Sequence, residues 1–319
     1  MTSKSSPALA RLSLTSQHLS SKRLSSTRST MSSHLLPNFD YITQGTKYTT
    51  SYENYLSNSG SIVSYFHDVP LDLDVDKHEA TFICEIPRWT NGKFEINTEL
   101  EGNPITQDVK DDQVRFVRNL FPYHGYIHNY GCFPQTWEDP TVKHLEWYGD
   151  NDPLDVCEVG DTVLKIGEIK RVKILGSLAM IDDGEMDWKV IVVDINDPLA
   201  KEVDDIHHLV TKRPGLLETT RQWFRDYKLP DGNPQTEFAY NGRYRNATET
   251  IEVIKECNKS WKDLIMGKKT GDDLPNIKNT AIRESPGYVE RFDIKRKKYT
   301  NREAPIPEEI DKSFFISKD

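Results

Sequence analysis

The chain has little cysteine and no long hydrophobic run. Its four cysteines lie far apart without a Cys-x-x-Cys pair, which argues against both a zinc site and a disulfide framework. No apolar stretch approaches the roughly 20 residues that span a bilayer, so no membrane span is expected. No Gly-rich phosphate loop is present, which excludes a nucleotide-binding enzyme of the Walker type.

The charge balance is acidic over the 319 residues. A formal net charge of -9 disfavours a nucleic-acid partner, and the basic block at residues 295–298 is short enough to be a solvated patch. With 36% hydrophobic and 10% aromatic residues, the chain can bury a sizeable core. We therefore expect a soluble globular protein in a reducing compartment.

The N-terminal segment differs from the rest of the chain. Residues 1–39 contain no Asp or Glu and are rich in Ser, Thr, Leu and basic residues, a composition typical of a mitochondrial transit peptide. A merely disordered tail is the alternative. We predict a transit peptide over residues 1–39, a single domain over residues 40–319 and a location in the mitochondrial matrix. Initiation at Met31 would instead leave a cytosolic form.

Short strands dominate the first two thirds of the chain. Between Tyr41 and Val193, alternating and apolar runs are separated by Gly, Pro, Asn and Asp, which indicates a mostly antiparallel β architecture. The strand candidates are residues 81–86, 92–97, 114–119, 156–159, 172–180 and 189–195. This number of short strands favours a closed or partly closed barrel, in a mainly β or α+β fold.

Helices are predicted after the strands. Apolar residues recur at helical spacing from Pro214–Gly215 until Pro230, and from Ala247 to Met266. A weaker helix is predicted over Ala200–Thr211. Residues 268–302 are expected to form an extended surface segment, and residues 314–316 to dock the tail on the core.

Three carboxylates lie within six residues, at Asp150, Asp152 and Asp155. Carboxylates this close repel one another, and a divalent cation between them relieves the repulsion. Oxygen-only ligands favour Mg²⁺, Mn²⁺ or Ca²⁺ over zinc. A solvated acidic turn is the alternative. An EF-hand loop is excluded, because its sixth position requires Gly and here is Asp155.

Other polar side chains near apolar strands have the residue types of a phosphoryl-transfer site. Metal ions held by carboxylates neutralise phosphate charge, while guanidinium, ammonium and phenol groups bind phosphate oxygens. The candidates are Glu85, Lys93, Glu95, Arg115, Tyr126, Tyr130, Asp182, Asp187, Lys189, Tyr227 and Lys228.

Several neighbouring residues are assigned structural roles instead. Arg118 is interpreted as a surface ion pair, and Glu138 and Asp139 as turn residues beside a proline. His124 and His128 have no carboxylate or cysteine beside them, so they are interpreted as structural histidines rather than a metal pair.

Six segments, in this order, resemble the soluble family I inorganic pyrophosphatases of the fungal and animal type, and their mitochondrial form in particular. They are EIPRWTNGKFE at 85–95, RFVRN at 115–119, GYIHNYG at 125–131, DNDPLDV at 150–156, DDGEMDWK at 182–189 and WFRDYK at 223–228. The resemblance implies a five-stranded OB-like β-barrel with flanking helices, and a homodimer. It also implies hydrolysis of inorganic diphosphate to two orthophosphates by direct in-line attack of a metal-activated water, without a phosphoenzyme. The implied cofactor is Mg²⁺, about three to four ions with substrate, with Mn²⁺ as a substitute.

The resemblance also implies a role for each candidate. Asp150, Asp155 and Asp187 would bind one Mg²⁺, Asp155 would touch a second, and Glu95, Asp182 and Asp187 would hold a third. Asp152 would be the general base acting on the water between the first two ions. Lys93 and Tyr130 would bind the phosphate under attack, and Arg115, Tyr227 and Lys228 the departing one. Glu85, Tyr126 and Lys189 match the other polar residues that surround the site in this family, and Tyr126 is a candidate proton donor.

Two other functions remain open at this stage. Hydrolysis of nucleoside di- or triphosphates would use the same chemistry, although no base-binding element is recognisable. A pyrophosphatase-shaped scaffold retained for partner binding is the third possibility, and the intact set of candidate ligands speaks against it.

Overall fold

The computed structural model describes residues 39–300 and 302–316. The predicted transit peptide, apart from residue 39, and the alternative start at Met31 lie outside the described residues. Within the described part, short strands dominate and the helices cluster between residues 198 and 265, as the sequence predicts.

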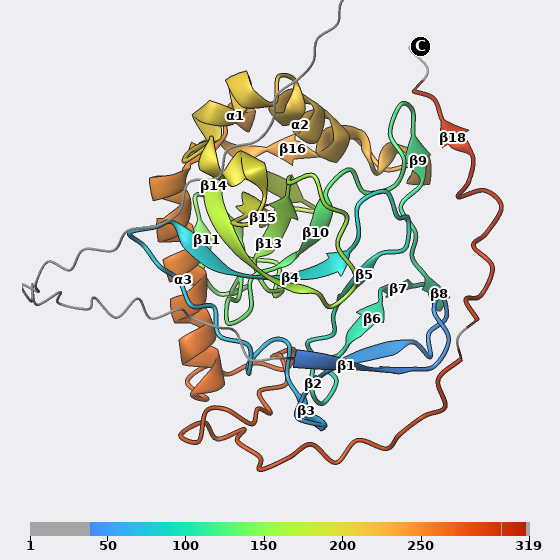
Figure 1. Ribbon diagram of the computed structural model, residues 1–319, viewed down its shortest axis with the longest axis vertical. Coiled ribbons are helices and arrows are strands. Elements are labelled where there is room, and N and C mark those ends of the chain that lie inside the picture. The colour runs from blue at the N-terminus through green and yellow to red at the C-terminus, as the bar shows by residue number, and fades with distance from the viewer. Residues whose placement is uncertain (1–38, 301, 317–319) are drawn as a thin grey trace, which may run out of the picture. The chain divides into compact units, whose positions relative to one another are not determined.

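The centre of the fold is a ring of paired strands. It consists of β4 (Glu79–Ile86), β10 (Asn129–Cys132), β13 (Asp155–Glu158), β14 (Ile169–Asp182) and β15 (Glu185–Asp194) (Figure 1). The order β15-β13-β10-β4-β14 closes because β14 also pairs with β15. All these pairings are antiparallel except β13 with β15, which is parallel. The closed ring agrees with the expected barrel.

Strand β4 shows why both faces of the ring are apolar. Its side chains alternate between the two sides of the strand, and Phe82 and Cys84 belong to one buried cluster while Ile83, between them, belongs to the other. A polar residue on such a strand is therefore buried whichever way it points. Glu85, at 3% exposure, is one of these.

A second sheet carries part of the predicted site. Its order is β1-β2-β6-β5, and β3 pairs with β2. The bounds are β1 (Phe39–Gln44), β2 (Glu53–Asn58), β3 (Ser61–Val63), β5 (Phe94–Ile96) and β6 (Ile105–Gln107). The shorter strands are β7 (Val109–Lys110), β8 (Gln113–Val114), β9 (Asn119–Leu120), β11 (Lys143–His144), β12 (Trp147–Tyr148), β16 (Glu237–Phe238), β17 (Arg245–Asn246) and β18 (Ser313–Phe314).

The predicted strand over residues 114–119 is wrong as a continuous element. Val114 pairs with β7, Phe116 bridges to Gly92, and Asn119 pairs with β18. The segment has three different partners within six residues, so no single ladder forms.

The two strongly predicted helices are confirmed as α2 (Leu216–Asp226) and α3 (Ala247–Ile265). Asn246 and Glu249 form a capping box at the start of α3, which satisfies two backbone N–H groups that have no partner inside the helix. Ile251 and Ile254 of α3 pack in the same buried cluster as β4. Helix α3 runs along one side of the strand ring (Figure 1).

The weaker helix predicted over Ala200–Thr211 is two elements. A 3-10 turn, η1 (Pro198–Lys201), ends before α1 (Ile206–Lys212) begins. Asp205 has an extended backbone and caps α1 by accepting from the N–H of His207, so it cannot lie within a helix. The two remaining 3-10 turns are η2 (Leu229–Asp231) and η3 (Ala239–Gly242).

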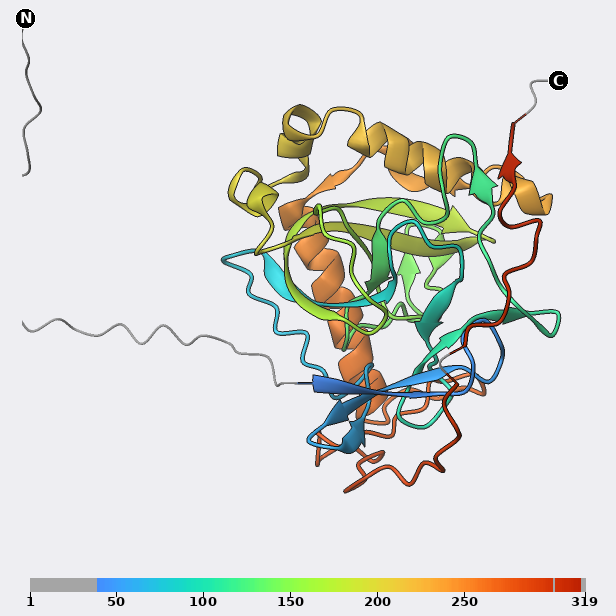
Figure 2. The ribbon, with the colours of Figure 1, turned by 45° about the vertical axis from the view of Figure 1, so that its right-hand side comes forward.

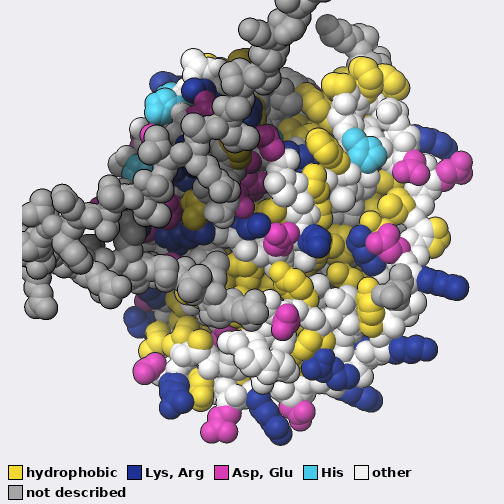
Figure 3. All heavy atoms as spheres, viewed as in Figure 1, with side chains coloured by type: hydrophobic (Ala, Val, Ile, Leu, Met, Phe, Trp, Pro, Cys, Tyr) yellow, Lys and Arg dark blue, Asp and Glu magenta, His cyan; other side chains and the backbone are white. Residues whose placement is uncertain are grey.

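The C-terminal segment follows α3 as an extended chain. Residues 268–300 contain no helix or named strand and pass below the second sheet (Figure 2). The tail docks at a strand edge rather than on the core, because β18 pairs with β9 while Phe315 stacks on Phe121 and both rings stay exposed. On the face shown in Figure 3, basic and acidic side chains are interspersed. Among the described residues, no helix is long and apolar enough to cross a membrane.

Candidate active site

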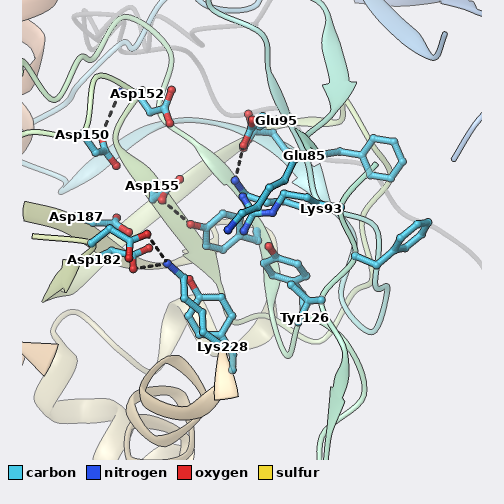
Figure 4. Close-up of a pocket in the computed structure, with 18 of the residues that line it drawn as sticks. Glu85, Lys93, Glu95, Tyr126, Asp150, Asp152, Asp155, Asp182, Asp187 and Lys228 are labelled. Atoms are coloured by element: carbon cyan, nitrogen blue, oxygen red, sulfur yellow. Dashed lines mark hydrogen bonds and ion pairs between the residues drawn. The ribbon is translucent and has the colours of Figure 1, made fainter. Parts of the chain in front are cut away.

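Every residue to which the sequence assigned a site role lines one cavity of about 880 Å³. The cavity opens beside the strand ring, between the ring and the second sheet, and α2 ends at its rim (Figure 4). Two sets of side chains face each other there. We call Asp150, Asp152, Asp155, Asp182 and Asp187 the acidic wall, and Lys93, Arg115 and Tyr126 the basic wall.

Strand register brings the acidic wall together. Asp155 begins β13, and its partner in the parallel neighbour β15 is Lys189. Asp187 precedes Lys189 by two residues, so the alternation of a strand puts both side chains on one face. Asp182 ends β14, the antiparallel neighbour of β15. Asp155 thus meets Asp182 and Asp187, which are distant from it in sequence, at one edge of the ring.

A tight turn supplies Asp150 and Asp152. The main-chain N–H of Asp152 donates to Asp150 Oδ1 at 3.1 Å, and the turn is paired with Glu138 through two main-chain hydrogen bonds of 2.9 Å. Gly149 is required at the entry to this turn, because a Cβ there would lie 2.4 Å from the carbonyl oxygen of Glu138. The turn and the Glu138 segment therefore pack as one unit.

Glu138 belongs beside the site, although the sequence analysis set it aside as a turn residue. Carboxylate oxygens of Glu138, Asp150 and Asp187 lie within 4.8 Å of one another. Glu138 Oε1 accepts from the N–H of Trp188 at 3.2 Å, whereas its buried Oε2 has no hydrogen-bond partner. Its neighbour Asp139 pairs instead with Lys269. Sequence gave no signal for Glu138, because its proximity to Asp187 exists only in the folded chain.

Lys189 is the cation buried within the acidic wall. Its Nζ lies 2.5 Å from Asp155 Oδ2 and 2.9 Å from the phenol oxygen of Tyr130, and it also contacts both carboxylate oxygens of Asp187. Burial by itself would lower the pKa of Lys189, but the charges of Asp155 and Asp187 outweigh burial and raise it. Lys189 is therefore a permanent cation that offsets only part of the negative charge around it.

The negative charge that Lys189 does not offset raises the pKa values of carboxyl groups in the acidic wall. Desolvation, followed by the charges of Asp187 and Asp152, raises the pKa of Asp150 well above its ordinary value. Desolvation, followed by the charges of Glu95 and Asp155, raises the pKa of Asp152 to about 8. A wall that holds protons this firmly in the absence of other cations also attracts a divalent ion.

The donor set of the wall fits a hard divalent ion. All candidate ligands are carboxylate oxygens, which suit Mg²⁺, Mn²⁺ and Ca²⁺. The unpartnered Oε2 of Glu138 and the raised pKa of Asp150 both show that the wall is incompletely satisfied by the protein alone. The residues present therefore fit the metal that the resemblance implies.

The basic wall is built on the second sheet. Lys93 and Arg115 lie on adjacent backbones, since the N–H of Lys93 donates to the carbonyl of Arg115 at 3.1 Å. Asp108 lies between the two side chains and accepts from Lys93 Nζ at 2.8 Å and from an Arg115 guanidinium nitrogen at 2.5 Å. Lys93 also pairs with Glu95 at 2.8 Å, as the shared strand face predicts. Asp108 is not among the site residues predicted from the sequence.

Glu85 and Lys228 complete the polar lining of the cavity. Glu85 Oε1 accepts from the N–H of Ile96 at 2.7 Å, which ties the ring to the second sheet beside the cavity. Lys228, just beyond the end of α2, contacts Asp182 and lies 3.3 Å from Asp183 Oδ2. Both Lys228 and Asp182 belong to the predicted set, and Figure 4 shows them in contact at one end of the cavity.

The tyrosines of the site are neutral and packed together. Burial raises the pKa values of Tyr126, Tyr130 and Tyr227. The rings of Tyr126 and Tyr130 lie 5.2 Å apart, and Tyr227 stacks on Trp223 at 5.0 Å. Each phenol thus remains a hydrogen-bond donor at neutral pH.

The residues left out of the site have structural contacts. His128 is buried and bonded to Thr220 Oγ1 at 2.7 Å, which confirms its structural role. Arg118 donates to the carbonyl of Pro230 at 3.1 Å, so its expected surface ion pair is replaced by a main-chain contact.

Comparison with known proteins agrees with this geometry. The family model described as inorganic pyrophosphatase matches residues 82–262. The mitochondrial inorganic pyrophosphatase of Saccharomyces cerevisiae is 48% identical over 95% of this chain and 97% of its own length. The inorganic pyrophosphatase of Candida albicans is 49% identical over 86% of this chain and 96% of its own length.

Solved structures show the same fold. The inorganic pyrophosphatase of Schistosoma japonicum superimposes with a TM-score of 0.81 at 39% identity, covering 87% of this chain and all of that one. A truncated soluble pyrophosphatase of Trypanosoma cruzi, solved in complex with PPi, gives a TM-score of 0.66 at 38% identity over 77% of this chain and 99% of its own. On the family match, the identity and the shared fold, the chain belongs to the inorganic pyrophosphatases.

Proposed function

We propose that this protein catalyses the Mg²⁺-dependent hydrolysis of inorganic diphosphate by direct attack of water on phosphorus. The observation that carries the proposal is the pairing of an acidic wall with a basic wall across one cavity. A small anion of high charge fits between them, with one side bound by Lys93 and Arg115 and the other by ions on the carboxylates. The complex of the Trypanosoma cruzi relative with PPi supports this choice of substrate.

The acidic wall would hold the metal. Asp150, Asp155 and Asp187 would share one Mg²⁺, Asp155 would contact a second, and Asp182 and Asp187 with Glu95 would hold a third. Bound Mg²⁺ neutralises phosphate charge and lowers the pKa of a nearby water. Lys189 keeps part of the carboxylate charge balanced when ions are absent.

Asp152 would accept the proton of the attacking water. It lies in the same turn as Asp150, one of the proposed metal ligands, so its carboxylate would be close to the attacking water. The oxygen of the water forms a bond to one phosphorus atom, the bridging P–O bond breaks, and its electron pair leaves with the second phosphate. One diphosphate and one water thus give two orthophosphates without a covalent enzyme intermediate.

The cations and phenols would bind the two phosphates. Lys93 and Tyr130 would hold the phosphate under attack, and Arg115, Tyr227 and Lys228 the departing one. Tyr126 keeps its proton because burial raises its pKa, so it would donate a hydrogen bond or a proton to a phosphate oxygen. Glu85 and Lys189 would keep the walls in register.

Location and assembly are part of the proposal. The acid-free composition of residues 1–39 and the similarity to a mitochondrial relative support a matrix enzyme with a cleaved transit peptide. N-terminal sequencing of protein from fractionated cells tests this, and would also reveal a cytosolic form starting at Met31. The single domain over residues 40–319 would act as a homodimer. A monomeric mass by light scattering would contradict that assembly.

The direct test compares substrates. Purified protein with Mg²⁺ should release phosphate from diphosphate much faster than from ATP, measured by a colorimetric phosphate assay at equal substrate concentration. Faster release from ATP would favour a nucleotide hydrolase. No release from either substrate would favour a scaffold role.

A further inference from the structure

Asn151 lies between Asp150 and Asp152, and its side chain holds the turn that carries them. Its backbone φ of +74° falls in the left-handed region, which Asn adopts more readily than most residues. The sequence analysis assigned Asn151 no role. Its contacts lead away from the cavity, toward the segment that precedes the turn and the one that follows α3.

The Asn151 amide joins two separate elements. The indole Nε1 of Trp137 donates to Asn151 Oδ1 at 3.0 Å and to its main-chain oxygen at 3.2 Å. Asn151 Nδ2 donates to the main-chain oxygen of Asp273 at 3.0 Å. An indole nitrogen only donates and a carbonyl only accepts, so the two partners fix the orientation of the amide. Neither an aspartate nor a glycine could make both contacts.

Both partners of Asn151 are firmly anchored. Trp137 is fully buried, and its main-chain N–H donates to the carbonyl of Cys257 in α3 at 3.1 Å. Lys269, four residues before Asp273, pairs with the buried carboxylate of Asp139 and lies 5.9 Å from the centre of the Trp137 ring. The bridge therefore ties the acidic turn to α3 and to the start of the C-terminal segment.

This anchoring matters because the turn carries like charges. Asp150 and Asp152 repel each other, and each raises the pKa of neighbouring carboxyl groups. Without a restraint, the turn would relax to separate the two carboxylates. Metal binding would then require the turn to be ordered again, which lowers affinity.

We propose that Asn151 is a positioning residue that, by bridging Trp137 and the main chain of Asp273, sets the affinity of the acidic wall for Mg²⁺. This inference rests on the proposed function, because it assumes that the wall binds Mg²⁺. It gives the extended C-terminal segment a role in the site, although no residue of that segment lines the cavity.

Two substitutions remove the bridge from opposite ends. Asn151→Gly keeps a residue that tolerates the left-handed backbone but removes the amide. Trp137→Phe keeps an aromatic ring but removes the indole N–H. Isothermal calorimetry with Mg²⁺ alone, in the absence of substrate, should show the dissociation constant rising about tenfold in each variant, since each loses two of the three hydrogen bonds between Asn151 and its partners. In the double variant, the dissociation constant should rise by less than the product of the two single-variant increases, since both substitutions act through one bridge.

The matched control is Asp272→Ala. Asp272 is exposed in the same segment, and its side chain makes no hydrogen bond or ion pair with any described residue, so the substitution should leave the dissociation constant at the parent value. Thermal unfolding of each metal-free variant gives its stability separately. A purely structural role would lower the melting temperature without changing the Mg²⁺ dissociation constant.

The possible results distinguish a failure of the proposed function from a failure of the positioning role of Asn151. Parent protein that binds no Mg²⁺ would refute the proposed function. Parent protein that binds Mg²⁺, with Asn151→Gly binding at the same dissociation constant, would overturn the positioning role alone. If Trp137→Phe does not fold, Asn151→Gly decides the question by itself, because its backbone conformation is preserved.

Discussion

The acidic and basic walls of the cavity balance their charges differently. On the basic wall, Lys93 and Arg115 share Asp108, and Lys93 also pairs with Glu95, so cations and carboxylates are nearly matched. On the acidic wall, Lys189 contacts two of the five carboxylates and Lys228 contacts one more. The basic wall is therefore satisfied by the protein alone, whereas the acidic wall carries an excess of negative charge that metal ions would neutralise.

The largest expected effect comes from Asp152→Asn. If Asp152 is the base of the acidic wall, kcat for diphosphate should fall by about 10²- to 10⁴-fold, since an amide cannot accept the proton. The Mg²⁺ dissociation constant should change little, because Asp152 is not among the proposed ligands. Steady-state kinetics and calorimetry on the same preparation measure both. A kcat near that of the parent would remove Asp152 from the mechanism.

Lys189→Met tests whether one cation holds the acidic wall together. Removal of one partner from a buried charge pair leaves the other uncompensated, so the metal-free protein should lose about 3–5 kcal/mol of unfolding free energy. Added Mg²⁺ should recover part of the loss. Urea denaturation with and without Mg²⁺ measures the two values. An equal loss in both conditions would indicate that Lys189 contributes packing alone.

Asp108→Asn tests the internal balance of the basic wall. Asp108 occupies Lys93 and Arg115 before substrate arrives, so its neutralisation should make both cations more available to phosphate. We expect phosphate to inhibit about fivefold more strongly, the equivalent of about 1 kcal/mol. Product-inhibition kinetics give the inhibition constant.

The control for this experiment is Asp111→Asn. Asp111 lines the same cavity, so its substitution makes the same change in net charge there. An equal gain in phosphate inhibition in both variants would show that overall charge, rather than the contact of Asp108 with the two cations, is responsible.

The last prediction concerns pH. The folded pKa of Asp152, about 8, lies above the ordinary value of 3.8, so the folded state binds more protons than the unfolded chain between these values. The stability that this proton contributes is complete below pH 3.8 and is lost as pH rises toward 8. Between pH 5 and 8, the melting temperature of the metal-free parent should therefore fall more than that of Asp152→Asn, which has no carboxyl proton to lose at this position. Parallel melting curves for the two proteins would contradict the raised pKa.

The sequence predicted which residues line the cavity better than it predicted the element boundaries. Asp155, Asp187 and Lys189 lie in strongly patterned strands, so their meeting on one face followed once β13 and β15 paired. The helices around Trp223 and Trp261 were equally clear, because their apolar residues repeat at helical spacing and proline or glycine follows.

The features that the sequence did not predict depend on contacts between segments that are brought together only by folding. Asp108 lies seven residues before Arg115, and only the turn between β7 and β8 brings them into contact. Glu138 reaches the N–H of Trp188 across fifty positions in the chain. The segment 114–119 has three different pairing partners, which local alternation does not reveal. Patterns in a single sequence indicate which side chains share one face of a helix or strand. They do not indicate which segments meet in the folded chain.

The most direct test of the account is the rate of diphosphate hydrolysis as Mg²⁺ is titrated into metal-free protein, with Ca²⁺ as a challenge. We predict no measurable activity in EDTA, a rise that saturates with Mg²⁺, and inhibition by Ca²⁺, which is larger and would occupy the carboxylates without Mg²⁺ geometry. Activity that persists unchanged in EDTA would contradict the claim that the acidic wall works through bound metal.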